Sequence, residues 1–442
     1  MTGKAVQNDN TGQGGAPARL PGGDGGGAEA SDRDGGYGRG MAVLFLLVLF
    51  GLSAGQLFWP ERVFSARENR YLARRPAVSA GKILSGEYMS QTETYVTDQF
   101  PGRDLWVSGK ALCQRLWGQK ENNGVYFAAD GYLIGKPASV DGEIADSNLA
   151  AATGLRDSGY EVALLVSPMA AETLREKLPA GAYDPAQGRL LAELRERAPA
   201  IFVDAAAALR QGAGAGKQMY YRTDHHWTTL GAYQAYLAYM SWLGEPPAAL
   251  EEMEDLTVSR DFYGTLWSKT GLPGMEPDEI HRLDGLGEMS YKVVYQGGDD
   301  SQPASVYDPA WLREKDQYGY FLGGNPALAV IRRTAGNSPG EGANGGGADE
   351  APVPWRGRRL LLFKDSYAHC FAPFLLAHFE EIHLIDLRYW KQDPIAYLEE
   401  NGIRQVLFLY NTDNFATDRS VSQVSAYLAA HLPPPPGGEV AG

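Results

Sequence analysis

Cysteine is scarce in this sequence: its 442 residues include only two, Cys113 and Cys370, which lie far apart along the chain. Two cysteines cannot form a framework of several disulfides, and they are too few for a cysteine-rich zinc site. A single disulfide between them would be compatible with the sequence. Two residues do not identify the redox compartment, so the cysteines leave the location of the protein open.

An excess of positive charge is also absent. Lysine and arginine number 40 against 54 aspartate and glutamate residues, which gives a formal net charge of -14 at pH 7. Proteins that bind nucleic acids need basic surfaces to neutralise phosphates, so this balance argues against a nucleic-acid partner. With 44% hydrophobic residues, the chain is long enough for one large domain or two smaller ones.

Large apolar side chains are rare in residues 1–40, which are rich in glycine, aspartate, alanine and asparagine. Such a segment cannot bury enough surface to offset the entropy of ordering, so we expect a disordered tail. Residues 41–59 are uncharged and strongly apolar, and at about 1.5 Å per residue they can cross a hydrocarbon core of roughly 30 Å. We therefore predict one N-terminal transmembrane anchor. A buried core helix and a signal peptide cleaved after Gly55 are the alternatives.

The charges beside this segment bear on its orientation. The tail carries four basic residues, Lys4, Arg19, Arg33 and Arg39, whereas five arginines follow the segment: Arg62, Arg67, Arg70, Arg74 and Arg75. Cytoplasmic flanks are usually the more basic ones, so charge alone predicts that the rest of the chain faces the cytoplasm.

A polar stalk and helical lead-in are expected over residues 60–122, and an α/β domain over residues 123–430, with insertions at about 250–330 and 335–354. The second insertion has low complexity, which predicts flexibility. The strands of the domain are short and almost wholly apolar, and helical stretches separate them, which indicates a parallel sheet with helices on both faces. The predicted strands are residues 161–168, 200–204, 359–363, 382–386 and 405–410, and the clearest predicted helices are 228–243, 371–379 and 393–401.

Two segments concentrate reactive side chains. In the first, residues 223–227, an extended backbone would place Asp224 and His226 on one side and His225 on the other. In the second, Ser366 follows an apolar strand, and the carboxyl ends of such strands form the ligand crevice of open α/β sheets. The three residues Asp224, His226 and Ser366 therefore predict a catalytic triad with His226 as the base. A helix-capping role for Ser366 is the alternative.

The sequence Asp224-His225-His226 is also similar to the DHH signature of metal-dependent phosphoesterases. A two-metal site of that kind needs further aspartate motifs upstream, and this chain has no convincing DxD partner. We therefore predict no metal site and no cofactor. The histidines could also be ordinary structural residues held by hydrogen bonds.

Residues 221–233, YRTDHHWTTLGAY, resemble the signature of the DHHW family of bacterial envelope proteins. Other segments agree with this family in the same order: 64–73, 100–104, 261–265, 268–271 and 364–368. The family is in turn similar to the SGNH-hydrolase-like proteins that O-acetylate alginate and related exopolysaccharides in the periplasm. In those proteins an Asp-x-His precedes the serine, a circular permutation of ordinary SGNH esterases.

This resemblance implies a circularly permuted SGNH-hydrolase-like fold with Asp224, His226 and Ser366 as its triad. It also implies a single-pass membrane protein whose large domain lies outside the cytoplasm, against the arginine count. Two features depart from the alginate proteins. The histidine is doubled by His225, and residues 335–354 have no counterpart that we recognise.

The function implied by the resemblance is O-acetylation of an exported or cell-wall polysaccharide, in which Ser366 carries the acetyl group. A membrane-bound acyltransferase of the MBOAT type would be the partner. A carbohydrate acetylesterase and a non-catalytic polysaccharide-binding or assembly protein are the alternatives. The expected substrate-binding residues are Tyr263, Trp267, Lys269, Tyr367 and Asn411. The candidate oxyanion donors are the backbone N–H groups of Ser366 and Tyr367 and the side-chain amides of Asn411 and Asn414.

Overall fold

The computed structural model describes residues 28–284, 290–295, 305–334 and 355–431. The chain divides into two compact units, one of Met1–Glu61 and Arg75–Pro101 and one of Arg62–Arg74 and Gly102–Gly442. The first 27 residues of the predicted tail and the predicted insertion 335–354 lie outside the described residues.

The first unit is helical. It contains α1 (Ala28–Phe58), α2 (Ala80–Leu84) and α3 (Glu87–Asp98). Within α1, the stretch Tyr37–Gln56 is long and apolar enough to cross a membrane, and none of it is buried by other parts of the chain. The helix begins at Ala28, so it includes residues that we expected in the tail.

A six-stranded sheet forms the centre of the second unit, in the order β6-β13-β11-β12-β10-β9. Its parallel part consists of predicted strands: β6 (Glu161–Ser167), β13 (Gln405–Asn411), β11 (Arg359–Lys364) and β12 (Glu381–Ile385). The last two strands in this order, β10 (Leu328–Thr334) and the edge strand β9 (Ser290–Tyr295), are antiparallel to their neighbours. Both come from the region around residues 250–330, which was predicted to be an insertion. This region therefore contributes the last two strands of the sheet.

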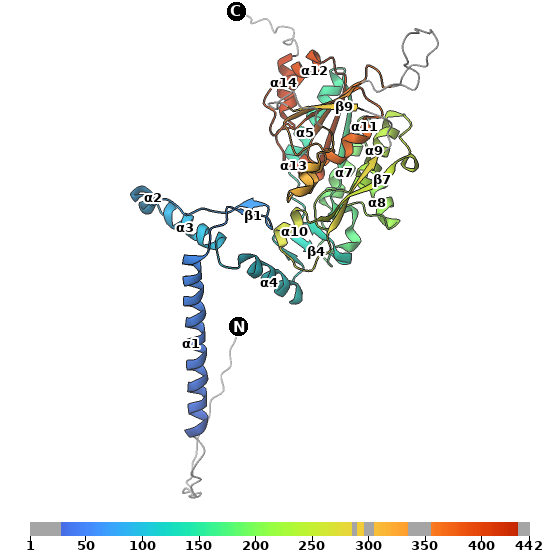
Figure 1. Cartoon of the computed structure of the whole chain (residues 1–442). Coiled ribbons are helices and arrows are strands. Elements are labelled where there is room, and N and C mark those ends of the chain that lie inside the picture. Colours follow the sequence, from blue (N-terminus) through green and yellow to red (C-terminus); the bar gives the residue numbers. More distant parts are fainter. Residues whose placement is uncertain (1–27, 285–289, 296–304, 335–354, 432–442) are drawn as a thin grey trace, which may run out of the picture. The chain divides into compact units, whose positions relative to one another are not determined.

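Side chains along β11 alternate between two hydrophobic cores, one on each face of the sheet. Leu360 and Leu362 belong to the first core, and Leu361 and Phe363 belong to the second. The first core is covered by α9 (Thr229–Leu243) and α11 (Ala368–Leu375). The second is covered by α5 (Gly142–Asp157), α7 (Ala186–Arg197) and α12 (Pro394–Glu400). The predicted α/β fold with helices on both faces is therefore confirmed (Figure 1).

Local sequence sets the ends of α9. The Thr228 side chain accepts a hydrogen bond from the Gly231 N–H, and Gly244 ends the helix with a φ of 70°. The helix α11 differs from the prediction, since it begins at Ala368 and keeps Pro373 within it. Pro373 is the sixth of the eight residues of this short helix, so its missing N–H removes one hydrogen bond close to the C-terminal end.

Two further expectations differ from the structure. The predicted strand 200–204 is reduced to a single bridge between Leu164 and Phe202 at the sheet edge. Cys113 is exposed and Cys370 is buried, and both are free thiols, so the disulfide that the sequence allowed is not formed.

The second unit also contains elements that we placed in the stalk. These are the hairpin of β1 (Phe64–Ser65) and β2 (Arg70–Tyr71) and the helix α4 (Arg103–Leu116). Two small sheets follow, made of β3 (Glu121–Asn122), β4 (Val125–Phe127) and β5 (Leu133–Gly135), and of β7 (Glu254–Phe262) and β8 (Asp278–Asp284). The shorter helices are α6 (Ala170–Thr173), α8 (Ala206–Gly214), α10 (Thr265–Thr270), α13 (Thr412–Thr417) and α14 (Gln423–His431).

Candidate active site

The segment before α9 folds into a tight loop, which we call the TDHHW loop (Tyr221–Trp227). An antiparallel bridge between Tyr220 and Trp227 closes the loop, and the Tyr221 N–H donates to the His226 carbonyl oxygen at 3.2 Å. Trp227 is fully buried, and its indole N–H donates to the Tyr367 carbonyl oxygen at 2.9 Å. This bond ties the loop to the residues after β11.

The structure brings Asp224, His226 and Ser366 together. The His226 Nδ1–H donates to Asp224 Oδ1 at 2.6 Å, and the Ser366 hydroxyl donates to His226 Nε2 at 2.7 Å. The His226 backbone N–H also donates to Asp224 Oδ1, at 3.0 Å. These two side-chain bonds leave the imidazole nitrogen that faces Ser366 unprotonated, which is the arrangement a general base needs.

Asp365 fixes the turn that carries Ser366. One of its carboxylate oxygens accepts from the Tyr367 N–H at 2.8 Å, and the other accepts from the Asn411 N–H and the Asn414 side-chain amide, both at 2.8 Å. Burial raises the pKa of this carboxyl above its ordinary value. The turn at the end of β11 is therefore held to the end of β13 by a completely enclosed carboxylate.

The second oxygen of Asp224 is held by the start of α10. Asp224 Oδ2 accepts from the Thr265 N–H at 2.7 Å and from the Thr265 hydroxyl at 2.9 Å. Gly264 precedes this contact, and a Cβ placed on it would lie 2.2 Å from the Asp224 Cβ. Only glycine therefore fits beside this carboxylate.

His225 does not lie where an extended backbone would place it. Because the loop bends instead of extending, the His225 ring lies against the His226 ring, with centroids 3.9 Å apart and the planes tilted by 38°. Its Nδ1–H donates to the Thr265 hydroxyl oxygen at 2.7 Å. The prediction that His225 faces away from the pair is wrong, although it makes no hydrogen bond to Ser366 in the described structure.

The charges of these groups follow from burial and from each other. Burial and the neighbouring His225 lower the pKa of His226 to about 4, so its imidazole is neutral at pH 7. Burial alone would raise the pKa of Asp224, but the charges and hydrogen bonds of His225 and His226 hold it well below its ordinary value. Burial alone would lower the pKa of His225, but Asp224 raises it.

Three of the expected substrate-binding residues lie near Asp224. Tyr263 and Trp267 form a tilted ring pair with centroids 4.7 Å apart, and the Trp267 backbone N–H donates to the Thr223 carbonyl oxygen at 3.0 Å. Lys269 is exposed at the end of α10. Their roles in binding remain predictions.

The other two expected residues have structural partners. Tyr367 is fully buried, and its hydroxyl donates to the His225 carbonyl oxygen at 2.6 Å. The Asn411 side-chain oxygen caps α13 by accepting from the Asn414 N–H at 2.8 Å. The Tyr367 N–H and the Asn414 amide both donate to Asp365, which leaves the Ser366 N–H as the backbone candidate for an oxyanion donor.

Sequence reasoning missed residues that come from the region 250–330. Tyr318 stacks on the His226 ring, with centroids 3.8 Å apart and planes 10° apart, and its hydroxyl donates to the Ser366 carbonyl oxygen at 3.3 Å. Lys315 donates to the Tyr263 carbonyl oxygen at 2.6 Å, and burial lowers the pKa of its ammonium group to about 8. No periodicity or motif in this region marked either residue.

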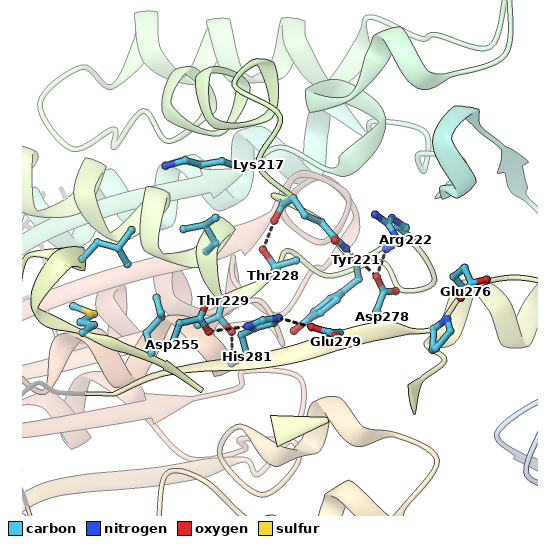
Figure 2. A pocket seen from close by; sticks show the side chains of 16 residues that line it. Lys217, Tyr221, Arg222, Thr228, Thr229, Asp255, Glu276, Asp278, Glu279 and His281 are labelled. Atoms are coloured by element: carbon cyan, nitrogen blue, oxygen red, sulfur yellow. Dashed lines mark hydrogen bonds and ion pairs between the residues drawn. The ribbon is translucent and has the colours of Figure 1, made fainter. Parts of the chain in front are cut away.

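A cavity of about 690 Å³ lies beside the TDHHW loop (Figure 2). It is lined by none of the triad residues, but it is lined by Asp278 of β8. Asp278 accepts hydrogen bonds from the Arg222 N–H at 2.9 Å and from the Thr223 N–H and hydroxyl, both at 2.7 Å. This carboxylate, which the sequence did not single out, fixes the backbone just before Asp224.

The triad carboxylate and the two histidines have ligand atoms within 4.8 Å of one another, close enough to hold a metal ion. Three of the histidine nitrogens in this group already have hydrogen-bond partners. Both ring nitrogens of His226 are bonded, to Asp224 and Ser366, and the His225 Nδ1 is bonded to Thr265. The donor set fits a proton-transfer chain better than a metal site, which would need these nitrogens free.

Comparison with known proteins shows which families this part of the chain is similar to. Residues 212–385 match the DHHW protein family, and residues 143–263 match the SGNH hydrolase-like domain of the acetyltransferase AlgX. A probable alginate O-acetylase AlgJ of Pseudomonas putida is 28% identical over 166 residues, which are 34% of this chain and 42% of that protein. A second one, of Pseudomonas fluorescens, is 27% identical over 206 residues, 43% of this chain and 48% of that protein. The chain thus spans less than half of each of these relatives.

Two solved structures share the fold. The crystal structure of a DHHW family protein from Eubacterium siraeum has a TM-score of 0.55 and 24% identity, and the match covers 69% of this chain and 96% of that one. Bacillus cereus PatB1, solved with a sulfonyl adduct, has a TM-score of 0.51 and 20% identity, with 67% and 98% covered. The SGNH-hydrolase-like fold expected from the resemblance is confirmed.

Proposed function

Because residues 212–385 match the DHHW protein family and the chain has an SGNH-hydrolase-like fold, we propose that it O-acetylates a polysaccharide of the cell envelope. The observation that carries this proposal is the chain of two hydrogen bonds from Ser366 through His226 to Asp224, at 2.7 and 2.6 Å. The relatives named as probable alginate O-acetylases support acetylation of a polysaccharide as the activity.

In the first step, Ser366 Oγ attacks the carbonyl carbon of an acetyl ester or thioester, and His226 Nε2 accepts the hydroxyl proton. The Asp224 carboxylate stabilises the resulting imidazolium, because its lowered pKa keeps it negatively charged. The Ser366 N–H donates to the developing oxyanion. His226 then gives its proton to the leaving group, and the acetyl group stays on Ser366.

In the second step, a sugar hydroxyl takes the place of the leaving group. His226 accepts the proton of this hydroxyl while its oxygen attacks the acetyl carbon, and Ser366 recovers its hydroxyl proton from His226. The products are an acetylated sugar and the free serine. If water enters in place of the sugar, the same residues act as an acetylesterase.

The membrane-spanning length of α1 supports an envelope location. The domain would face away from the cytoplasm and receive acetyl groups from a membrane-bound acyltransferase of the MBOAT type. A C-terminal alkaline phosphatase fusion should be active in intact cells, and an inactive fusion would contradict this placement.

The central test is turnover of p-nitrophenyl acetate by the wild type and by Ser366→Ala. The variant should lose at least about 10³-fold in kcat/KM, because the nucleophile is removed. Ser147→Ala, on the exposed face of α5, is the matched control and should behave as the wild type. Wild-type turnover should also survive dialysis against EDTA.

Three outcomes separate the candidate functions. Acetylation of added polysaccharide by the wild type supports the transferase, whereas release of acetate alone supports the acetylesterase. No turnover by the wild type would leave the chain as a non-catalytic polysaccharide-binding protein, and wild-type turnover by Ser366→Ala would exclude Ser366 as the nucleophile.

A further inference from the structure

The β1–β2 hairpin is firmly attached to the second unit. The Arg67 guanidinium donates to the Gly271 carbonyl oxygen at 2.8 Å, although the two residues are 204 positions apart in sequence. Ser65 and Leu72 are buried, with 1% and 4% of their surface exposed. The segment that follows α1 in sequence is thus part of the domain surface and not a free stalk.

The hairpin contacts the element that holds the triad carboxylate. The Arg67 guanidinium lies 5.0 Å from the centre of the Trp267 ring, and the Lys315 ammonium group lies 4.6 Å from the same ring. Trp267 belongs to α10, whose Thr265 bonds Asp224. A short path of contacts therefore leads from the hairpin to the triad.

Two separate cavities share a lining residue at the tip of the hairpin. One, of about 490 Å³, is lined by Phe64, Asn69, Trp311, Glu314, Lys315 and Asp316. The other, of about 540 Å³, is lined by residues that include Asn69, Arg70, Arg103, Thr265, Ser268 and Lys269. Asn69 lines both. The first cavity reaches Lys315 and the second reaches Thr265, the residue bonded to Asp224 and His225.

Asn69 occupies an unusual backbone position. It is exposed and has a φ of 51°, in the left-handed region that asparagine tolerates better than most other residues. Such conformations concentrate at ligand sites. The position holds the Asn69 side chain at the junction of the two cavities.

We propose that the β1–β2 hairpin is one wall of the polysaccharide-binding groove, with Asn69 contacting the acceptor chain and Arg67 positioning Trp267 and thereby α10. This inference rests on the proposed function. An extended polymer suits two cavities that share Asn69, since it can contact both, and the second cavity is lined by Thr265, which is bonded to Asp224. Amide, basic and aromatic side chains are suited to sugar hydroxyls and ring faces.

The test measures binding of the full chain in detergent to alginate, to a neutral β-glucan and to chitosan oligosaccharides. Every protein carries Ser366→Ala, so binding is measured without turnover and does not depend on the triad chemistry. Asn69→Gly removes the side chain but keeps the left-handed backbone, and Arg67→Met removes the bond to Gly271. Val63→Ala, exposed on the same segment and lining neither cavity, is the matched control.

At least one polymer should bind, and Asn69→Gly and Arg67→Met should each raise its dissociation constant about tenfold or more. Arg67→Lys should recover part of the loss, because lysine can still reach the Gly271 carbonyl oxygen. Val63→Ala should change the constant less than about twofold. Binding of all variants at the parental level, or no binding of any polymer, would overturn the inference, whereas failure of acetyl transfer alone would not.

Discussion

Two buried aspartates make hydrogen bonds to residues of the TDHHW loop, and the groups around these two carboxylates differ. Asp224 and Asp278 are both 2% exposed. Asp224 faces two imidazoles, which hold its pKa well below its ordinary value although burial alone would raise it. The donors bonded to Asp278 are neutral groups of Gln218, Arg222 and Thr223, and burial raises the pKa of this carboxyl.

The difference shows how one residue type takes two roles at the same depth. A carboxylate that stabilises an imidazolium must stay charged, and the neighbouring histidines keep Asp224 charged. A carboxylate that fixes a backbone needs only well-placed acceptor oxygens, which Asp278 supplies. We therefore expect substitutions around Asp224 to change the chemistry, and substitutions at Asp278 to change how well the loop is positioned.

The largest effect should come from Asp224→Asn. The amide cannot stabilise an imidazolium and can turn His226 into the wrong tautomer, so kcat/KM for a small acetyl ester should fall by about 10³- to 10⁴-fold. Asp146→Asn, an exposed aspartate on α5, is the control and should keep wild-type kcat/KM. A loss smaller than about tenfold in Asp224→Asn would place Asp224 in the same structural class as Asp278.

Gly264→Ala approaches the same carboxylate without changing its charge. The added Cβ would lie 2.5 Å from Asp224 Oδ2, so the carboxylate must move, and a displacement of this size should lower kcat/KM by about 10²-fold. Gly109→Ala is the control, because no atom lies within 4 Å of its added Cβ. Wild-type kinetics in a folded Gly264→Ala protein would show that the site does not depend on this geometry.

Much of the fold could be predicted because apolar strands and capped helices are encoded locally. The runs 359–363, 382–386 and 405–410 became β11, β12 and β13, and Thr228 and Gly244 set the ends of α9. The antiparallel strands β9 and β10 were missed, since they come from a region without clear alternation. The place of β10 in the sheet depends on pairing with β12, which is distant in sequence, and β9 in turn pairs with β10.

Part of the site could also be predicted, because some of its signals are local in the sequence. The order of Asp224, His226 and Ser366 and the strand before Ser366 indicated the triad, and the structure brings these three together. The predicted position of His225 was wrong, because an extended strand was expected and the chain forms a closed loop here. Asp278 and Tyr318 could not be found, since only the folded chain brings them to the loop.

Asp278→Asn should have a smaller effect than the changes around Asp224. The amide nitrogen would face the Thr223 donors, so two hydrogen bonds would be lost or strained, at a cost of about 1–3 kcal/mol. We expect a lower melting temperature and a loss of roughly tenfold in kcat/KM. A loss as large as that of Asp224→Asn would erase the distinction between the two aspartates.

The smallest effect should be that of His225→Gln, which should change the pH dependence of kcat/KM. Only the neutral His226 imidazole can accept the Ser366 proton, so wild-type kcat/KM should rise with pH through about 4 and then level off. His225 lowers the pKa of His226, and glutamine carries no charge. Removing this neighbour should therefore raise the pKa of His226 and move the acidic limb to higher pH.

The measurement is kcat/KM for p-nitrophenyl acetate from pH 3 to 8, with folding checked at each pH by circular dichroism. His431→Gln is the control, because this histidine of α14 is bonded to Asp393, the N-cap residue of α12, and to no triad residue in the described part of the chain. Its acidic limb should match the wild type. If the limb of His225→Gln does not move, or moves to lower pH, His225 does not tune the base. Of the two charged neighbours, Asp224 alone would then affect the pKa of His226.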